Sequence, residues 1–209
     1  IGKNIIVQYP LVGNIKKILQ HLNAKVNKKE DTEWNKKVNE WKESYPLKYA
    51  QDGTLKPQYI VERIYELTKG EALITTEVGQ HQIWAAQYYK YTSPRQFISS
   101  GGLGTMGFGF GACMGAQIGR PDKKVINIAG DGSFRMNCNE MATAVEYKLP
   151  IIIALFNNGV LGMVRQWQEL FFGGRFSATD IERGTDFVKL VEAFGAKGIN
   201  VTKPEEVDD

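Results

Sequence analysis

The fold is decided by the stretch Val125-Ile126-Asn127-Ile128-Ala129-Gly130-Asp131-Gly132-Ser133, in which an apolar run leads directly into a Gly-Asp-Gly-Ser turn. A second apolar run, Ile151–Phe156, leads directly into Asn157-Asn158; 24 residues, with one predicted helix, lie between Gly132 and Asn157. A strand, a helix and a second strand form a βαβ unit, whose crossover opens both strand ends on the same edge of a parallel sheet. Ligands of open α/β sheets bind at that edge, so the sequence predicts a binding site where the two turns meet.

From residue 56 onward, segments with helical spacing of apolar residues alternate with short apolar segments. This alternation favours a parallel sheet covered by helices on both faces, and we predict an α/β fold with a helical N-terminal lead. The expected strands are 72–76, 96–99, 125–129, 151–156 and 198–201. The expected helices are 57–67, 82–89, 139–147, 162–171 and 186–194, together with a glycine-rich turn and helix within 101–119.

The first 55 residues differ from the rest of the chain. Apolar residues recur at helical spacing after Asn14, and again, with two tryptophans, within the lysine-rich stretch 25–48. Acids interleaved with the lysines favour a solvated charged face. Because the chain starts at Ile1 rather than Met and stops in an acidic stretch, we expect it to be a piece of a longer polypeptide. Residues 1–55 would then end a preceding domain and its linker, and residues 56–209 would form a second domain, truncated at its C-terminus.

Composition argues against several classes of function. The chain is 43% hydrophobic and 23% charged with a net charge of +3, which is ordinary for a globular protein and too weakly basic for a nucleic-acid partner. No apolar run approaches the ~20 residues that cross a bilayer, so no membrane partner is expected. Cys113 and Cys138 lack the spacing of a zinc or redox motif, and we predict reduced thiols in a cytoplasmic protein.

The residues after the two central strands have the chemistry of a metal and diphosphate site. Asp131 offers a carboxylate, Asn158 an amide oxygen, and the turn beyond it a backbone carbonyl near Val160, all of them ligands that suit Mg²⁺ or Ca²⁺. Phosphate oxygens and water commonly complete the coordination of Mg²⁺. Gly132 and Ser133 lead into a helix, whose free N–H groups favour a phosphate. Either motif alone would be an ordinary turn, but together they predict a metal-bridged diphosphate.

Gly-Asp-Gly, some two dozen residues and then Asn-Asn resembles the diphosphate signature of thiamine diphosphate enzymes. The resemblance implies that Asp131, Asn158 and the main-chain carbonyl of Val160 bind Mg²⁺. Other segments resemble the C-terminal domain of the acetolactate synthase catalytic large subunit, and the match runs from about residue 56 to 201. These segments are Gly79-Gln80-His81-Gln82, Ser100-Gly101-Gly102-Leu103-Gly104-Thr105-Met106-Gly107 and Gly162-Met163-Val164-Arg165-Gln166-Trp167-Gln168. Residues 1–4 and 10–13 look like the end of that family's middle, flavin-binding domain.

The resemblance assigns roles around thiamine diphosphate. Met106 would lie between the two rings, and the Gly104 carbonyl would accept a hydrogen bond from the 4′-amino group. Trp167 would shape the acceptor pocket, although Met163 and Trp167 also have the spacing of ordinary core residues. His81 would line the diphosphate end, although a histidine near a helix start is often only a partly exposed polar residue. The implied catalytic residues are Gly104, Met106 and Trp167, and the implied cofactor-binding residues are Gly79, Gln80, His81, Gly104, Thr105, Met106, Asp131, Gly132, Ser133, Asn158, Val160, Gly162 and Met163.

For the whole enzyme, the resemblance implies decarboxylation of pyruvate and transfer of its two-carbon unit to pyruvate or 2-oxobutyrate. It also implies FAD in the middle domain, a dimer or tetramer, and a possible small regulatory subunit. Members of the family use a glutamate from a separate pyrimidine-binding domain, contributed across a dimer interface. We therefore expect this chain by itself to be inactive.

Three alternatives stay open on the sequence alone. Residues 102–107 fit the GxGxxG pattern of a nicotinamide dehydrogenase, although no long apolar strand leads into them. The chain could instead be a non-catalytic binding or assembly module, or part of another thiamine diphosphate enzyme such as a 2-oxo acid decarboxylase, oxidase or carboligase. The chain also departs from the family at residues 110–113, Phe-Gly-Ala-Cys in place of the usual Leu-Pro-Ala-Ala, which puts the local helix start in doubt.

Overall fold

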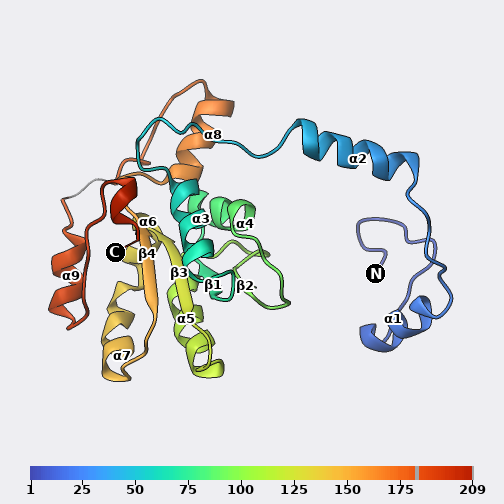
Figure 1. Ribbon diagram of the computed structural model, residues 1–209, viewed down its shortest axis with the longest axis horizontal. Coiled ribbons are helices and arrows are strands. Elements are labelled where there is room, and N and C mark those ends of the chain that lie inside the picture. The colour runs from blue at the N-terminus through green and yellow to red at the C-terminus, as the bar shows by residue number, and fades with distance from the viewer. Residues whose placement is uncertain (182–183, 209) are drawn as a thin grey trace. The chain divides into compact units, whose positions relative to one another are not determined.

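The computed structural model describes residues 1–181 and 184–208, which divide into two compact units, Ile1–Lys48 and Tyr49–Asp209 (Figure 1). The first unit contains two helices, α1 (Ile15–Asn23) and α2 (Glu33–Ser44). Asn14 and Thr32 cap them, because each side chain accepts a hydrogen bond from a backbone N–H in the first helical turn. Neither helix has a buried residue. The helical lead is therefore confirmed, while its origin in a preceding domain stays a prediction.

The second unit is built on a four-stranded parallel sheet with the strand order β2-β1-β3-β4 (Figure 1). The strands are β1 (Leu73–Thr76), β2 (Phe97–Ile98), β3 (Val125–Gly130) and β4 (Ile152–Phe156). Every residue of β1 and β3 is buried, as expected for central strands covered on both faces. Gly130 pairs with Phe156, so the ends of β3 and β4 are level and the turns that follow them start side by side.

Helices follow the strands as the sequence predicts. They are α3 (Pro57–Leu67), α4 (Gln80–Tyr88), α5 (Phe108–Gly119), α6 (Asp131–Asn137), α7 (Met141–Glu146), α8 (Gly162–Phe172) and α9 (Phe187–Ala193), with 3-10 turns η1 (Cys138–Glu140) and η2 (Pro204–Glu206). In the described part of the chain, no helix combines the length and the apolar character needed to span a membrane.

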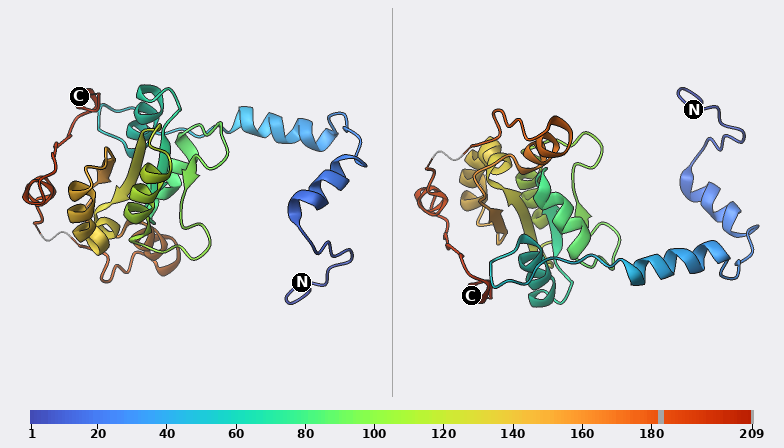
Figure 2. Two further views of the ribbon diagram at one scale, coloured as in Figure 1. Left: turned by 90° about the horizontal axis from the view of Figure 1, so that it is seen from below. Right: turned by 90° about the horizontal axis from the view of Figure 1, so that it is seen from above.

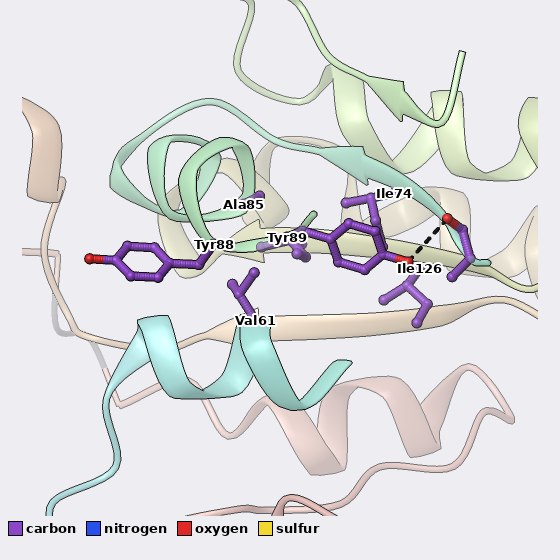
Figure 3. Packing of buried hydrophobic residues seen from close by; sticks show 8 residues of the cluster. Val61, Ile74, Ala85, Tyr88, Tyr89 and Ile126 are labelled. Carbon is purple, nitrogen blue, oxygen red and sulfur yellow. Dashed lines mark hydrogen bonds between the residues drawn. The ribbon is translucent and has the colours of Figure 1, made fainter. Parts of the chain in front are cut away.

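The sheet carries a hydrophobic core on each face, and Figure 2 shows the helices around it from two sides. On one face, Val61 of α3 and Ala85 of α4 pack against Ile74 and Ile126 (Figure 3). Within the same cluster the Tyr89 hydroxyl donates a hydrogen bond to the Ala72 carbonyl. On the other face a second cluster joins α5, α6 and α7 to β3; its buried members are Phe110, Met114, Ala129, Phe134, Met141 and Ala144. The predicted parallel sheet with helices on both faces is confirmed.

Two predicted elements differ in the structure. The helix expected at 139–147 is shorter in the structure, because its first residues belong to the 3-10 turn η1 and α7 covers only Met141–Glu146; α6, which begins at Asp131 itself, is an additional helix that the sequence did not predict. The strand expected at 198–201 is wrong, since these residues form neither strand nor helix. An apolar cavity of about 670 Å³ lies between β4 and residues 195–199, and a strand needs an adjacent ladder of hydrogen bonds.

Candidate diphosphate and metal site

A pocket opens at the carboxyl ends of β3 and β4, between the N-terminal ends of α4, α6 and α8. It brings together most of the residues that the sequence singled out: Gly79, Gln80, His81, Met106, Asp131, Gly132, Ser133, Asn158, Val160, Gly162 and Met163. It is also lined by residues that were not predicted to belong to the site: Val78, Trp84, Gly130, Phe156, Leu161 and Val164. The strand-end argument therefore predicted where these segments meet.

Three predicted residues do not line this pocket. Gly104 and Thr105 lie in the exposed loop between β2 and α5. Trp167 projects from α8 with 57% of its surface exposed, and its ring packs edge-on against Phe171 at 6.2 Å between centroids. The structure therefore separates the predicted ring-contacting and acceptor residues from the diphosphate end, with Met106 as the exception.

Asp131 links the two central strand ends. Its side chain is 1% exposed, and its Oδ1 accepts a hydrogen bond from the Gly132 N–H at 2.9 Å. Its Oδ2 accepts a hydrogen bond from the Gly159 N–H at 2.8 Å, across to the loop that follows β4. The carboxylate is thus fixed in orientation. The Gly132 N–H, which we expected to face a phosphate, is here donated to Asp131.

The backbone around Val160 is oriented by a short antiparallel bridge to Asp180. The flanking residues make its hydrogen bonds, from the Ile181 N–H to the Gly159 carbonyl and from the Leu161 N–H to the Thr179 carbonyl, both at 2.8 Å. Successive residues of an extended strand turn their backbone groups to opposite sides, so the Val160 carbonyl points away from the segment 179–181.

Asn158 orients the same turn from its other side. Its Oδ1 accepts a hydrogen bond from the Val160 N–H at 3.1 Å, which leaves that oxygen a second lone pair for another partner. Among the described residues, no group of three or more His, Cys, Asp or Glu side chains could hold a metal ion. A cation in this pocket would therefore meet one carboxylate together with neutral amide and carbonyl oxygens.

His81 lines the pocket from the first turn of α4. It is 6% exposed, and its buried Nε2 has no hydrogen-bond partner within residues 1–181 and 184–208. A Cβ at Gly130 would lie 2.7 Å from Nδ1, and one at Gly79 would lie 2.8 Å from Cε1, so both glycines are needed for the ring to fit. Burial lowers the pKa of His81 to about 4, and a hydrogen bond to the backbone of Glu77 opposes this shift. The imidazole is therefore neutral at pH 7.

Gln80, the first residue of α4, reaches α8 across the edge of the pocket. Its Nε2 donates a hydrogen bond to Gln166 Oε1 at 2.9 Å. Its side-chain oxygen lies so close to Gly162 that a Cβ there would overlap it. Ser133 is held differently, because its hydroxyl donates to the Val78 carbonyl at 2.9 Å. These contacts join α4 to α8, and α6 to the segment before α4, around the pocket.

Glu77 is a functional candidate that the sequence reasoning missed. It directly follows β1 and is completely buried. Its Oε2 accepts a hydrogen bond from the Gly107 N–H at 2.7 Å, and its Oε1 accepts one from the Phe110 N–H at 2.9 Å. Burial raises the pKa of Glu77, and its backbone hydrogen bonds oppose that shift. The strand-end rule that selected Asp131 could have selected it too, had the rule been applied to β1.

Residues 77–209 match the family model described as thiamine pyrophosphate enzyme, C-terminal TPP binding domain. The chain belongs to the thiamine pyrophosphate enzymes. The GxGxxG segment 102–107 of this thiamine pyrophosphate enzyme lies in an exposed loop after β2, a strand of two residues. The dehydrogenase alternative is therefore replaced by the thiamine diphosphate reading.

Several proteins with similar sequences are acetolactate synthases. This thiamine pyrophosphate enzyme is 42% identical over 215 residues to the acetolactate synthase large subunit of Haemophilus influenzae, covering 100% of this chain and 38% of that protein. It is 38% identical to the isozyme 3 large subunit of Escherichia coli, with 38% of that protein covered. It is 45% identical to the acetolactate synthase of Mycobacterium leprae, with 35% covered. The chain thus spans less than two fifths of the length of these relatives.

A solved structure supports the fold of this thiamine pyrophosphate enzyme. The thiamine diphosphate-dependent 4-hydroxybenzoylformate decarboxylase of Rhodococcus jostii RHA1 superposes with a TM-score of 0.70 at 26% sequence identity. The superposition covers 78% of this chain and 31% of the decarboxylase chain. The parallel sheet described above is therefore shared with an enzyme of the same cofactor class.

Proposed function

We propose that this chain supplies the diphosphate- and Mg²⁺-binding part of the active site of an acetolactate synthase. One observation carries the proposal: Asp131, Asn158 and Val160, which follow the ends of adjacent parallel strands, line a single pocket with Asp131 fixed by two backbone N–H groups. The names of the relatives support acetolactate synthase over other thiamine diphosphate enzymes.

The residues present fit a magnesium diphosphate. One carboxylate, one amide oxygen and one carbonyl are the hard oxygen donors that Mg²⁺ prefers, and they leave positions for phosphate oxygens. His81 lines this pocket, and its buried Nε2 is a polar atom that lacks a hydrogen-bond partner among the described residues. The glycines at 79 and 130 leave no room for side chains beside that ring. We infer that His81 and Gln80 line the diphosphate while Asp131, Asn158 and Val160 hold the metal.

The remaining predicted residues would orient the rings of the cofactor. Met106 lines the pocket, and the adjoining Gly104 carbonyl and Thr105 would contact the pyrimidine. Thiamine diphosphate, when bound, supplies the electron sink for decarboxylation of a 2-oxo acid, while the protein supplies position and enclosure. Gly162 and Met163 at the start of α8 would border the cofactor, with Trp167 farther along the helix at the acceptor side.

We also infer the setting of this part in a longer enzyme. Residues 1–55 would end a flavin-binding middle domain and its linker, so FAD belongs to the whole enzyme. Pyruvate would be the donor, and pyruvate or 2-oxobutyrate the acceptor. The whole enzyme would be a cytoplasmic dimer or tetramer, with or without a regulatory subunit. The chain by itself would not form acetolactate, because a glutamate from another domain completes the site in the family.

Calorimetric titration of this chain with thiamine diphosphate, with and without Mg²⁺, tests the proposal. We expect binding that depends on Mg²⁺ and is lost in Asp131→Asn, which keeps the shape of the side chain and removes its charge. Asp122→Asn is a matched control, because Asp122 is exposed and pairs with Arg120 away from the pocket. Ligand at a hundred times its dissociation constant should stabilise the folded wild type by about 2.7 kcal/mol. Binding that ignores Mg²⁺, or that survives in Asp131→Asn, would contradict the proposed site.

A further inference from the structure

Glu77 is a buried carboxylate for which the proposed cofactor contacts leave no role. Its side chain is completely buried at the end of β1, where an ionised group is costly unless its oxygens are hydrogen-bonded. Both oxygens accept backbone N–H groups, one from Gly107 and one from Phe110. Both oxygens of the carboxylate therefore bind the start of α5.

The start of α5 depends on this carboxylate. The first N–H groups of a helix have no partner within the helix, and the cap residue Gly107 has no side chain to offer one. Glu77 supplies both acceptors from another element, and its charge is favourable at a helix N-terminus. A Cβ at Gly109 would lie 2.5 Å from the Thr76 backbone, so the helix approaches the end of β1 as closely as a glycine allows.

The same contact fixes the peptide that follows Met106. The N–H of Gly107 is held by Glu77, and its carbonyl accepts a hydrogen bond from Asn137 Nδ2 at 2.6 Å. Gly107 adopts φ +84°, a conformation that favours glycine. Gly107 is thus held through its N–H by the residue after β1 and through its carbonyl by α6, while Met106 lines the pocket beside Gly132.

We propose that Glu77 is a positioning residue that sets where Met106 lies relative to the diphosphate end of the pocket. This inference rests on the proposed function, because it assigns Met106 to the rings of thiamine diphosphate. Glu77 acts through the Gly107 peptide and touches no cofactor atom. It therefore governs the binding of the rings, and leaves the Asp131 site intact.

Glu77→Gln separates these two effects. Glutamine keeps the volume of the side chain, but it has one acceptor oxygen and an NH₂ group that would face one of the two N–H donors. One hydrogen bond to the start of α5 is therefore lost, and the backbone around Met106 and Gly107 is held less firmly. Asp131 keeps its own contacts, which come from Gly132 and Gly159.

The test compares two ligands on the same chain in excess Mg²⁺, inorganic pyrophosphate and thiamine diphosphate. The dissociation constant of pyrophosphate divided by that of thiamine diphosphate measures what the rings add to binding. We expect Glu77→Gln to lower this ratio about tenfold, the order of one lost charge-assisted hydrogen bond, and to leave pyrophosphate binding unchanged. Glu71→Gln is the control, because its side chain is exposed before β1, and it should change neither ligand.

Asn137→Ala provides a second variant at an exposed position, should Glu77→Gln not fold. It removes the other anchor of Gly107 and should lower the same ratio. The inference is overturned if folded Glu77→Gln keeps the wild-type ratio, if both ligands weaken equally, or if the rings add nothing in the wild type while pyrophosphate binds. Failure of the wild type to bind pyrophosphate with Mg²⁺ would instead overturn the proposed function, and the inference with it.

Discussion

His81 lies between two glycines, and its ring fits only because neither position carries a side chain. The imidazole is buried, and Nε2 has no hydrogen-bond partner in the part of the chain that the structure describes. A buried polar atom of this kind costs stability, and such costs are often found at sites that bind a ligand. The position of His81 is therefore explained more simply by a polar ligand in the pocket than by packing.

The pKa of His81 predicts how stability depends on pH. In the unfolded chain His81 binds a proton near its ordinary pKa of 6.5, whereas in the folded chain its pKa is about 4. The contribution of His81 to the free energy of unfolding is therefore complete above pH 6.5. It falls by about 3 kcal/mol as the pH is lowered from 6.5 to 4. Denaturant melts at a series of pH values would measure this loss.

Two comparisons isolate the effect. His81→Gln should flatten the pH dependence in this range, and His21→Gln, at an exposed position on α1, should leave it unchanged. The raised pKa of Glu77 acts in the opposite sense and is common to all three proteins, so it cancels in the comparison. An equal pH dependence in the wild type and His81→Gln would refute the assignment.

The site residues differ in how far the sequence could predict them. Asp131 and Asn158 each follow an apolar run, and their oxygens have an evident common ligand, so strand order and ligand chemistry were enough. Glu77 follows β1 in the same way, but its partners are backbone N–H groups of α5. Backbone N–H groups occur in every residue except proline, so the sequence does not indicate which of them Glu77 binds. The contact between Glu77 and α5 is evident only from the folded backbone.

Among the elements, α5 shows how glycines in one helix can have opposite effects. Gly109 packs against the backbone at the end of β1, whereas a Cβ at Gly111 would meet nothing within 4 Å. Position 109 therefore needs a glycine, and position 111 only tolerates one. Because a glycine in the interior of a helix is less stable than alanine, the two positions should respond differently to the same change.

We expect Gly109→Ala to destabilise the chain by about 2 kcal/mol or more, because a fixed backbone must move to admit the Cβ. Gly111→Ala should stabilise it by about 0.5–1 kcal/mol, through the better helix propensity of alanine. Chemical denaturation of the two variants beside the wild type would measure both. Equal effects at the two positions would show that the close approach of α5 to β1 is not maintained in solution.

Elements with strong local signals were predicted well, and those that depend on distant partners were not. The apolar runs of β3 and β4 and the proline at the start of α3 are local signals. The segment 198–201 has an apolar, strand-like sequence, but strand formation depends on a neighbour that sequence spacing does not reveal. The doubt about the start of α5 is resolved similarly, since the helix begins at Phe108 with Glu77 in place of a local cap.

At the scale of the whole molecule, the buried core belongs to one unit. Of the residues that the structure describes, every buried hydrophobic one lies between Val61 and Ala144, whereas α1 and α2 have none. Helices of 9 and 12 residues are only marginally stable in water without such packing. The two units should therefore differ strongly in local stability.

Hydrogen exchange followed by mass spectrometry would test this difference. Amides of residues 1–48 should exchange rapidly, and those of β1 and β3 should be the most protected, close to the global free energy of unfolding. A chain of residues 49–209 should then unfold at the same temperature as the whole. Slow exchange throughout α2 would show that its tryptophan face is covered in solution.

The free side of β4 has a consequence for how this chain behaves at high concentration. In the described sheet β4 pairs only with β3, and Ile152 on it is 45% exposed. Unpaired N–H and C=O groups along an apolar edge strand can form hydrogen bonds with any extended polypeptide, including a second copy of this chain. Concentrated samples should therefore aggregate through pairing of β4 with extended segments of other copies. The substitution Ile152→Lys should reduce this aggregation, which light scattering would measure.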